Sequence, residues 1–206
     1  GLGSMAGGAR YLPAGPVPRG AVRAAAILDL ATGVSAPGRI EPVLAGDPEA
    51  LFLARHSAAH VMAQAIGEAL PGTRFAIGPV IEDGFYYDVD PPRPISDEDL
   101  PAIENRMREI IAGGFPFRRR VVTREEALAE FGCDPYKGEI LSELPQGTEI
   151  SFYTQDTFTD LCRGPHLPST AGIGAVKLLK VAGAYWRGDE KRKMLTRIYG
   201  TAWRTQ

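Results

Sequence analysis

Four side chains with nitrogen or sulfur ligand atoms stand out by their spacing. His56 and His60 are four residues apart, so in a helix they lie on one face, one turn apart. Cys162 and His166 have the same separation around a Gly-Pro turn, and Asp160 stands beside them. In an extended segment Asp160 and Cys162 point to one face, and the turn returns His166 toward them. The pattern predicts one cleft that is formed by both segments.

Two kinds of chemistry fit this group. Two histidines, a cysteine and a third histidine provide four ligands, which is the number in a tetrahedral zinc site. A neutral imidazole is also a competent base near pH 7, so the same side chains can activate a water molecule against an ester without a metal. The spacing alone leaves both alternatives open.

A long helix is predicted to carry the histidine pair. It begins at Asp47-Pro48-Glu49, where an Asp cap precedes a Pro at the first helical position, and it ends near Leu70 before a Pro-Gly stop. On a helical wheel the histidines share their side with small residues, whereas the larger apolar residues lie opposite. We therefore expect room for a groove on the histidine side.

The segments that follow mix strands and helices without a regular alternation. An Asp-Gly turn at 83–84 predicts a hairpin, and two capping-box patterns predict further helices. The expected elements are a hairpin over 74–90, a helix over 96–113, a strand over 117–122, a short helix from 123, and strands over 149–153 and 176–186. This order predicts an α+β fold, with an antiparallel sheet packed against helices and a long central helix that carries the histidine pair.

The first 48 residues differ in composition from the rest of the chain. Residues 1–5 are interpreted as an expression scar, Gly1 to Ser4, followed by a start methionine. Residues 6–48 are rich in Gly, Pro and Ala and contain a single strand-like run, Ala24 to Leu30, so they predict a small N-terminal appendage without its own core. Residues 49–206 are predicted to form the main domain.

Charge and composition narrow the class of protein. The chain has 23 basic and 25 acidic residues, so contact with nucleic acid requires a local basic patch. No run approaches the roughly 18 apolar residues that a membrane span needs. The two cysteines do not resemble the framework of a small secreted protein. A cytoplasmic protein without a membrane partner is expected.

Three longer strings around these residues are similar to a known family. HSAAH at 56–60, AIGPVIEDGFYYD at 76–88 and DLCRGPH at 160–166 resemble the editing (N2) domain of bacterial threonyl-tRNA synthetase. The resemblance extends from Leu51 to Trp203. Because the strings are long and specific, the chain is identified as similar to this domain over most of its length.

The resemblance also bears on the two ends of the chain. The strings at 183–189 and 197–203 look like the family's junction toward its catalytic domain. The family usually begins with a small β-grasp domain, and residues 6–48 are too short for a complete copy. They are therefore interpreted as a truncated or degenerate β-grasp-like appendage, followed by the tRNA-editing domain at 49–206.

The resemblance implies a hydrolase that removes serine attached by mistake to threonine tRNA. A synthetic pocket rejects an analogue that lacks one methyl by only about 1 to 3 kcal/mol, so a second site must remove the wrong ester and exclude threonine by size. The implied partner is the acceptor end of tRNA(Thr) carrying serine. If the chain is a fragment of a synthetase, the catalytic and anticodon-binding domains would be further partners; a free-standing editing protein is the alternative, and no aminoacylation by this chain is implied.

Matching positions provide the implied site residues. The catalytic residues are His56, His60, Lys137, Cys162 and His166. The substrate-binding residues are Asp160, Arg163 and Tyr136. No cofactor is implied: the histidines and Lys137 position and activate water, Asp160 holds the seryl ammonium or hydroxyl, and Cys162 shapes the pocket.

Two other functions are weighed against this one. The first is a zinc-dependent deacylase similar to alanyl-tRNA editing proteins, in which zinc is held by His56, His60, Cys162 and His166. The second is a tRNA-binding module that has lost catalysis. A metal assay separates the first alternative from the metal-independent hydrolase, and binding without turnover identifies the second.

Basic residues near the implied site are candidates for contacts with RNA phosphates. The candidates are Arg118, Arg120, Arg187 and Lys191. Arg118 and Arg120 are two residues apart in a predicted strand, so they lie on one face and can meet one RNA strand. Tyr185 and Trp186 are candidates for stacking on the terminal adenine, with an ordinary core position as the alternative.

Overall fold

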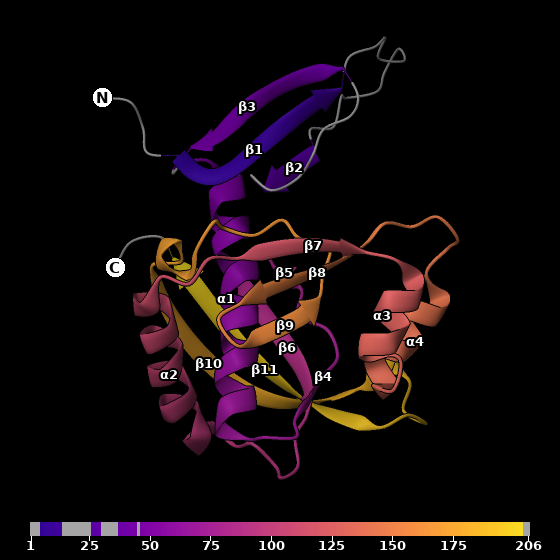
Figure 1. Ribbon diagram of the computed structural model, residues 1–206. Coiled ribbons are helices and arrows are strands. Elements are labelled where there is room, and N and C mark those ends of the chain that lie inside the picture. The colour runs from indigo at the N-terminus through magenta and orange to yellow at the C-terminus, as the bar shows by residue number, and fades with distance from the viewer. Residues whose placement is uncertain (1–4, 14–25, 30–36, 45, 204–206) are drawn as a thin grey trace.

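The computed structural model describes residues 5–13, 26–29, 37–44 and 46–203 (Figure 1). The interpretation of Gly1 to Ser4 as an expression scar lies outside these residues. Helices and antiparallel sheets together confirm the α+β class. No helix in the described ranges has the length and apolar character needed to span a membrane.

The histidine pair lies on helix α1 (Pro48–Ala69), which begins and ends where the sequence predicts. Pro48 occupies the first helical position as predicted, but the Asp47 side chain makes no cap hydrogen bond to the helix: its carboxylate accepts from the preceding Leu44 amide at 2.8 Å. The helix is buried without interruption from Ser57 to Ile66. The expected open groove on the histidine side is therefore wrong over most of its length, because both sides of the helix are covered.

One side of α1 packs on the largest sheet, in the order β10-β11-β6-β4 with β5 paired to β6. All pairs are antiparallel. The strands are β4 (Arg74–Phe75), β5 (Val80–Ile81), β6 (Gly84–Asp90), β10 (Ala175–Tyr185) and β11 (Met194–Trp203). Alternation along β6 places Phe85, Tyr87 and Val89 on the buried face, against the apolar side of α1.

The histidine side of α1 is covered by a second sheet, in the order β7-β8-β9 (Figure 1). Its strands are β7 (Arg118–Val122), β8 (Ile150–Gln155) and β9 (Phe158–Leu161). The Gln155 side chain donates to the carbonyl of His60 at 3.1 Å, and the Phe158 ring lies edge-on to the His60 ring. The helix is thus enclosed between two sheets, where the sequence predicted one.

Helix α2 (Leu100–Gly113) follows a short 3-10 turn, η1 (Asp97–Asp99), and packs on α1 and β10. The predicted capping box is present: the Ser96 amide donates to the Asp99 carboxylate at 2.8 Å. Ile103, Met107 and Ile110 form the buried stripe that the spacing predicts. This helix closes the core beside the largest sheet.

Two short helices stand on the other side of the second sheet. They are α3 (Arg124–Phe131), which Thr123 caps as predicted, and α4 (Pro135–Glu143). The sequence pattern did not predict α4. Its cap is Asp134, whose carboxylate accepts from the amides of Tyr136 and Lys137 at 2.9 and 2.8 Å. This helix is important because it carries Lys137.

The N-terminal part of the chain forms a third sheet, in the order β2-β1-β3, at the beginning of α1 (Figure 1). Its strands are β1 (Met5–Pro13), β2 (Ala26–Asp29) and β3 (Gly38–Leu44). The expectation of a single strand here is wrong: β2 lies in the predicted run, and β1 is the central strand that pairs with both β2 and β3. Val43 is fully buried in the main core, and Arg10 donates to Glu49 at 2.9 Å.

Candidate functional site

The two segments predicted to meet do so around the sulfur of Cys162. Its Sγ atom lies 3.4 Å from Nε2 of His56 and 3.3 Å from Nε2 of His166. The His56 and His166 rings are stacked with their centroids 4.1 Å apart, and the His60 ring lies 4.2 Å from that of His166. Three imidazoles and a thiol therefore form one compact group.

Backbone contacts orient His56. Its Nδ1 lies 2.9 Å from the carbonyl oxygen of Pro165, and this oxygen can only accept, so Nδ1 carries the hydrogen. Burial lowers the pKa of His56, which keeps the ring neutral near pH 7. A neutral ring protonated on Nδ1 has a free lone pair on Nε2, and this lone pair faces the Cys162 thiol.

His166 is held in the interior by Ser57 and by aromatic rings. Its Nδ1 lies 3.2 Å from the Ser57 hydroxyl, which also accepts a hydrogen bond from the Leu167 amide at 3.0 Å. The Phe117 ring stacks on it and the Tyr153 ring lies edge-on to it, at centroid distances of 5.0 and 4.6 Å. Burial, together with the two neighbouring histidines, lowers the pKa of His166 far below its usual value.

A buried ion pair stands across from this group. The Lys137 ammonium lies 2.6 Å from Oδ1 of Asp160, and both side chains are about 5% exposed. The Tyr87 hydroxyl donates to the other carboxylate oxygen of Asp160. Burial, followed by the charge of Asp160, raises the pKa of Tyr87 well above its usual value, so the phenol stays protonated. The carboxylate is thus fixed from two sides.

The ion pair and part of the histidine group line one cleft of about 350 Å³. His60, Lys137, Asp160, Cys162 and Arg163 all border it. His56 and His166 do not border it and lie behind Cys162. Apolar side chains of Ile77, Ile140 and Leu161 complete the walls. A small polar molecule that enters this space meets an ion pair, an imidazole and a thiol at once.

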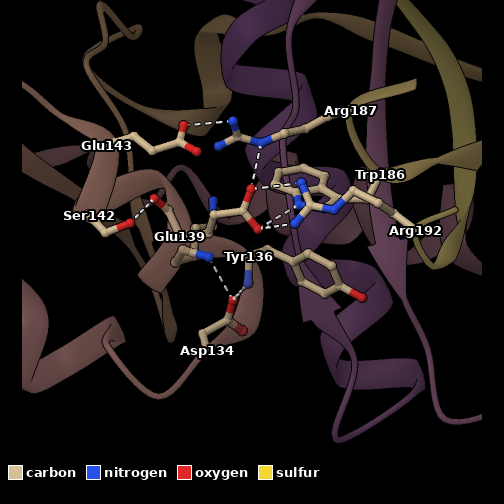
Figure 2. Close-up of polar contacts among 9 residues, drawn as sticks. Asp134, Tyr136, Glu139, Ser142, Glu143, Trp186, Arg187 and Arg192 are labelled. Carbon is tan, nitrogen blue, oxygen red and sulfur yellow. Dashed lines mark hydrogen bonds and ion pairs between the residues drawn. The ribbon is translucent and has the colours of Figure 1, made fainter. Parts of the chain in front are cut away.

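Tyr136 is a predicted substrate-binding residue that the structure places elsewhere. Its hydroxyl donates to Asp90 at 2.8 Å, and its ring packs edge-on against Trp186. Figure 2 shows the ring on the side of α4 where Trp186, Arg187 and Arg192 gather around Glu139. Lys137, the next residue, points into the cleft, because successive residues of a helix face different directions.

The predicted RNA contacts are all near the surface, but several are already paired. Arg120 is exposed and bridges to Glu130 at 2.7 Å, whereas Arg118, two residues earlier, is exposed on the same strand. Arg187 bridges to Glu139 at 2.9 Å and to Glu143 at 2.6 Å (Figure 2). Lys191 is exposed. Trp186 is only 4% exposed, which favours the core position over stacking on a base.

The donor set also fits a zinc ion. One ligand atom from each of His56, His60, Cys162 and His166 lies within 4.8 Å of the others. A tetrahedral zinc with bonds of about 2.0 to 2.3 Å places its ligand atoms roughly 3.3 to 3.8 Å apart, so ligand atoms at the 4.8 Å limit would have to move closer by about 1 Å. The hydrogen bond from His56 Nδ1 to the Pro165 carbonyl is typical of the outer shell of a zinc-bound histidine. These four residues could therefore hold zinc as well as a water molecule.

Two residues of the site were not identified from the sequence. Tyr87 lies in a run of aromatic and β-branched residues, which reads as an ordinary strand. Ser57 lies between small residues in a helix. The signal that could have found Tyr87 is its alternation with Phe85 and Val89, which places its ring on the α1 side of the sheet.

The chain is similar in sequence to one known protein family and to several threonine-tRNA ligases. Residues 150–199 match the family of the threonyl and alanyl tRNA synthetase second additional domain. Threonine-tRNA ligases are 53% identical in Rubrobacter xylanophilus, over 87% of this chain, and 51% identical in Thermus thermophilus, over 90%. The resemblance to the editing domain of threonyl-tRNA synthetases is confirmed.

The match to threonyl-tRNA synthetases covers most of this chain but a smaller part of the relatives. The chain spans 28% of the length of the Rubrobacter protein and 30% of the Thermus protein. A third relative, the threonine-tRNA ligase of Sinorhizobium medicae, is 55% identical over 82% of this chain and 26% of its own length. The family match at 150–199 includes Asp160, Cys162 and His166.

Proposed function

We propose that the chain hydrolyses the ester that joins serine to tRNA(Thr), and spares the threonyl ester. The observation that carries this proposal is the meeting of a buried Lys137–Asp160 pair with His60 and Cys162 in one cleft of about 350 Å³. Relatedness to threonyl-tRNA synthetases supports the choice of an aminoacyl ester over other esters.

Asp160 is the proposed anchor for the seryl group. One of its oxygens accepts from Lys137 and the other from Tyr87, and each carboxylate oxygen has a second lone pair. A seryl ammonium or hydroxyl can therefore donate to Asp160 without displacing either neighbour. An anchor that is fixed from two sides places the ester carbonyl at a constant depth, so an additional methyl group on the substrate must meet the wall.

His60 and Lys137 are the proposed groups that act on the ester. His60 borders the cleft, and a neutral imidazole can accept a proton from water as the water attacks the carbonyl carbon. The Lys137 ammonium has three N–H groups and uses one on Asp160, so it can donate to the developing oxyanion. The leaving group is the ribose oxygen of the ester, which receives the proton that His60 took from the water and departs as a hydroxyl.

Cys162 is proposed to shape the pocket and not to form a covalent intermediate. Its thiol is placed to donate to Nε2 of His56, which has a free lone pair. A thiol held in this way fixes the His56 and His166 rings behind the wall of the cleft. We expect Cys162→Ala to retain part of the turnover, whereas a covalent enzyme would lose almost all of it.

A zinc-bound hydrolase is the second candidate, and the close grouping of four ligand atoms favours it. In that case His56, His60, Cys162 and His166 would hold the ion, and one of these ligands would have to give its place to the water whose pKa the bound ion would lower. The roles of Lys137 and Asp160 in holding the substrate are the same in both candidates.

The deciding experiment is hydrolysis of seryl-tRNA(Thr) and threonyl-tRNA(Thr) by the purified chain, with and without a strong chelator. We expect loss of the serine ester only, unchanged by the chelator and reduced about 100-fold or more in His60→Ala. Activity that the chelator removes and zinc restores would favour the second candidate. A folded chain that binds either tRNA but hydrolyses neither ester would contradict both candidates and indicate a binding module.

A further inference from the structure

A second and larger cavity, of about 740 Å³, lies on the other side of α4 from the cleft. We call it the α4 pocket, and it is lined among others by Arg74, Asp90, Tyr136, Glu139, Lys191 and Arg192. Neither the proposed hydrolysis nor the histidine group uses this cavity. Tyr136 and Trp186, which both line it, are 4% exposed and pack edge-on.

The charges of the α4 pocket leave a positive excess. Four cations line it against two carboxylates, and each carboxylate is already satisfied. Asp90 accepts from Lys193 at 2.7 Å and from the Tyr136 hydroxyl at 2.8 Å. Glu139 accepts from Arg192 at 2.8 Å, and Arg187 and Trp186 also donate to it, as Figure 2 shows. The charges of Asp90 and Glu139 are therefore balanced by those of Lys193 and Arg192.

Two cations of the pocket stay outside these pairs. The side chains of Arg74 and Lys191 are exposed and form no ion pair with a carboxylate in the described part of the chain. They stand on different segments, β4 and the turn between β10 and β11. Because the remaining charge is positive and comes from two directions, the expected ligand is an anion, and a chain of phosphates can meet both side chains.

The α4 pocket and the cleft share their walls. On α4, Tyr136 and Glu139 face the pocket, whereas Lys137 and Ile140 face the cleft. Beside α4, Arg74 borders the pocket, and Ala76, two residues later, borders the cleft. The two spaces are separated by about the width of one helix, roughly 10 to 12 Å with side chains.

We infer that the α4 pocket binds the phosphates of the RNA strand that leads to the esterified end, through Arg74 and Lys191. The inference rests on the proposed function, because it requires the 3′ end of an RNA in the cleft. A strand whose last nucleotide lies in the cleft has its preceding phosphates within a helix width of that position. Arg74 and Lys191 then contribute to RNA affinity and not to the chemical step.

The test measures binding of an RNA hairpin that reproduces the acceptor stem of tRNA(Thr) with its single-stranded 3′ end, over a range of salt concentrations. We expect Arg74→Gln and Lys191→Gln each to weaken binding several-fold and to reduce the slope of log K against log salt by about 0.7 to 0.9. The matched control is Arg39→Gln on β3, an arginine whose side chain is 78% exposed and which lies outside the pocket. This control should change neither the affinity for the hairpin nor the salt slope beyond a small effect.

Two further measurements keep the inference separate from the proposed function. In seryl-tRNA hydrolysis, the two variants should raise KM and leave kcat unchanged. Trimming the single-stranded 3′ nucleotides from the hairpin should abolish the difference between the variants and the unmodified chain. If the unmodified chain binds the hairpin but hydrolyses nothing, the proposed function fails and the pocket assignment stands.

Three outcomes would overturn the inference. One is hydrolysis with the same KM in all variants, and another is the absence of hairpin binding by the unmodified chain. The third is competition by a polyglutamate peptide as effective as competition by an RNA of equal charge, which would indicate an acidic protein partner. Thermal unfolding should be the same in all variants, since both side chains are exposed.

Discussion

His56 and His166 are the residues for which the structure makes the clearest statement about protonation. Burial lowers the pKa of both. In the unfolded chain a histidine takes up a proton near pH 6.5, so below that pH the unfolded state binds more protons than the folded state. The stabilising effect is therefore complete above about pH 7 and is lost as the pH falls through 6.5 toward the lowered values.

The first prediction follows from this linkage. The free energy of unfolding should fall between pH 7.5 and 5, with a limiting slope of about 1.4 kcal/mol per pH unit for each histidine. His166→Asn removes one titrating group, so the slope should become shallower even if the variant is less stable at every pH. Urea denaturation at several pH values gives both slopes. Equal slopes would show that His166 is not responsible.

The second prediction concerns Lys137 and Asp160. Replacing Lys137 by Met leaves the Asp160 charge buried with only the Tyr87 hydroxyl as its partner, and should cost about 3 to 5 kcal/mol of stability. Adding Asp160→Asn removes the unpaired charge and should recover most of this loss. Chemical denaturation of the two single variants and the double variant measures the coupling. Additive losses would contradict a direct ion pair.

The residue spacing predicted the group of histidines with Cys162, but it did not predict the Tyr87 hydroxyl that supports Asp160. His56, His60, Cys162 and His166 were found because their spacing alone suggests shared chemistry. Lys137 came only from the family resemblance, since a single Lys after a Tyr has no pattern of its own. Tyr87 was missed because its role depends on a partner 73 residues away, and its own segment is typical of any buried strand.

Among the connecting elements, the turn between Cys162 and His166 has the strictest geometry. Gly164 has a φ of 70°, in the region that favours glycine, and a Cβ atom there would overlap the hydroxyl of Tyr153. The Gly164 amide also donates to the Cys162 sulfur at 3.2 Å. A side chain at this position must therefore move the turn that places both functional residues.

The third prediction compares this glycine with a second one. Gly147 has a φ of 78°, but a Cβ atom there would have nothing within 4 Å. Gly147→Ala should therefore cost only the backbone term, about 1 to 2 kcal/mol, and leave hydrolysis intact. Gly164→Ala should cost more and lower hydrolysis about ten-fold or more, because the reacting groups shift. Similar activity in the two variants would show that the turn adapts.

Helix α4 shows how a remote contact can position a functional side chain. Glu139 is tied to Arg187, Arg192 and Trp186, and these contacts lower the pKa of its carboxyl to about 2, with the hydrogen bond from Arg192 as the largest cause. They hold α4 against the turn after β10. Lys137 lies on the same helix, two residues earlier.

The fourth prediction tests this anchoring. Glu139→Gln should lower kcat for seryl-tRNA hydrolysis several-fold, because Lys137 loses its fixed position relative to Asp160, and KM should not rise, because the α4 pocket loses a carboxylate and stays positive. The matched control is Glu143→Gln, which removes one ion pair to Arg187 from the end of the same helix. Steady-state kinetics measures kcat and KM for both variants and for the unmodified chain. Equal kcat in Glu139→Gln and the unmodified chain would contradict the anchoring role.

The sequence could predict α1, α2 and α3 but not α4, and the reason is physical. The first three have clear caps, and α1 and α2 also have long runs of helix-forming residues. In α4, Pro135 and Gly138 are weak helix formers. The helix is stabilised instead by its Asp134 cap and by packing of Tyr136 and Ile140 against Trp186, which is distant in sequence. Strands β1 and β3 were missed similarly, since Gly and Pro interrupt their patterns.

At the scale of the whole molecule, the N-terminal sheet is joined to the main domain and can add to its stability. It contacts the beginning of α1 through the Arg10 pairs to Asp47 and Glu49 and through Val43 in the main core. The histidine group begins two turns further along the helix. The predicted division into residues 6–48 and 49–206 proposes that the second part folds without the first, and this can be measured.

The fifth prediction is that a chain starting at Asp47 folds and keeps the hydrolytic activity but unfolds at a lower temperature. The loss of stability comes from exposure of Ala50 and Leu53, which are fully buried in the intact chain. Circular dichroism during heating, together with hydrolysis of seryl-tRNA, tests both parts. Loss of the main fold on truncation would show that the third sheet belongs to the same cooperative unit.

The enclosure of α1 between two sheets has a consequence for exchange with solvent. Every residue from Ser57 to Ile66 is buried, so the amides of this segment cannot be reached by local fraying. Their deuterium uptake should require global opening of the molecule and should be the slowest in the chain. The histidine group would then be disrupted only when the whole molecule unfolds. Under denaturant, catalysis and the last protected amides should disappear at the same concentration.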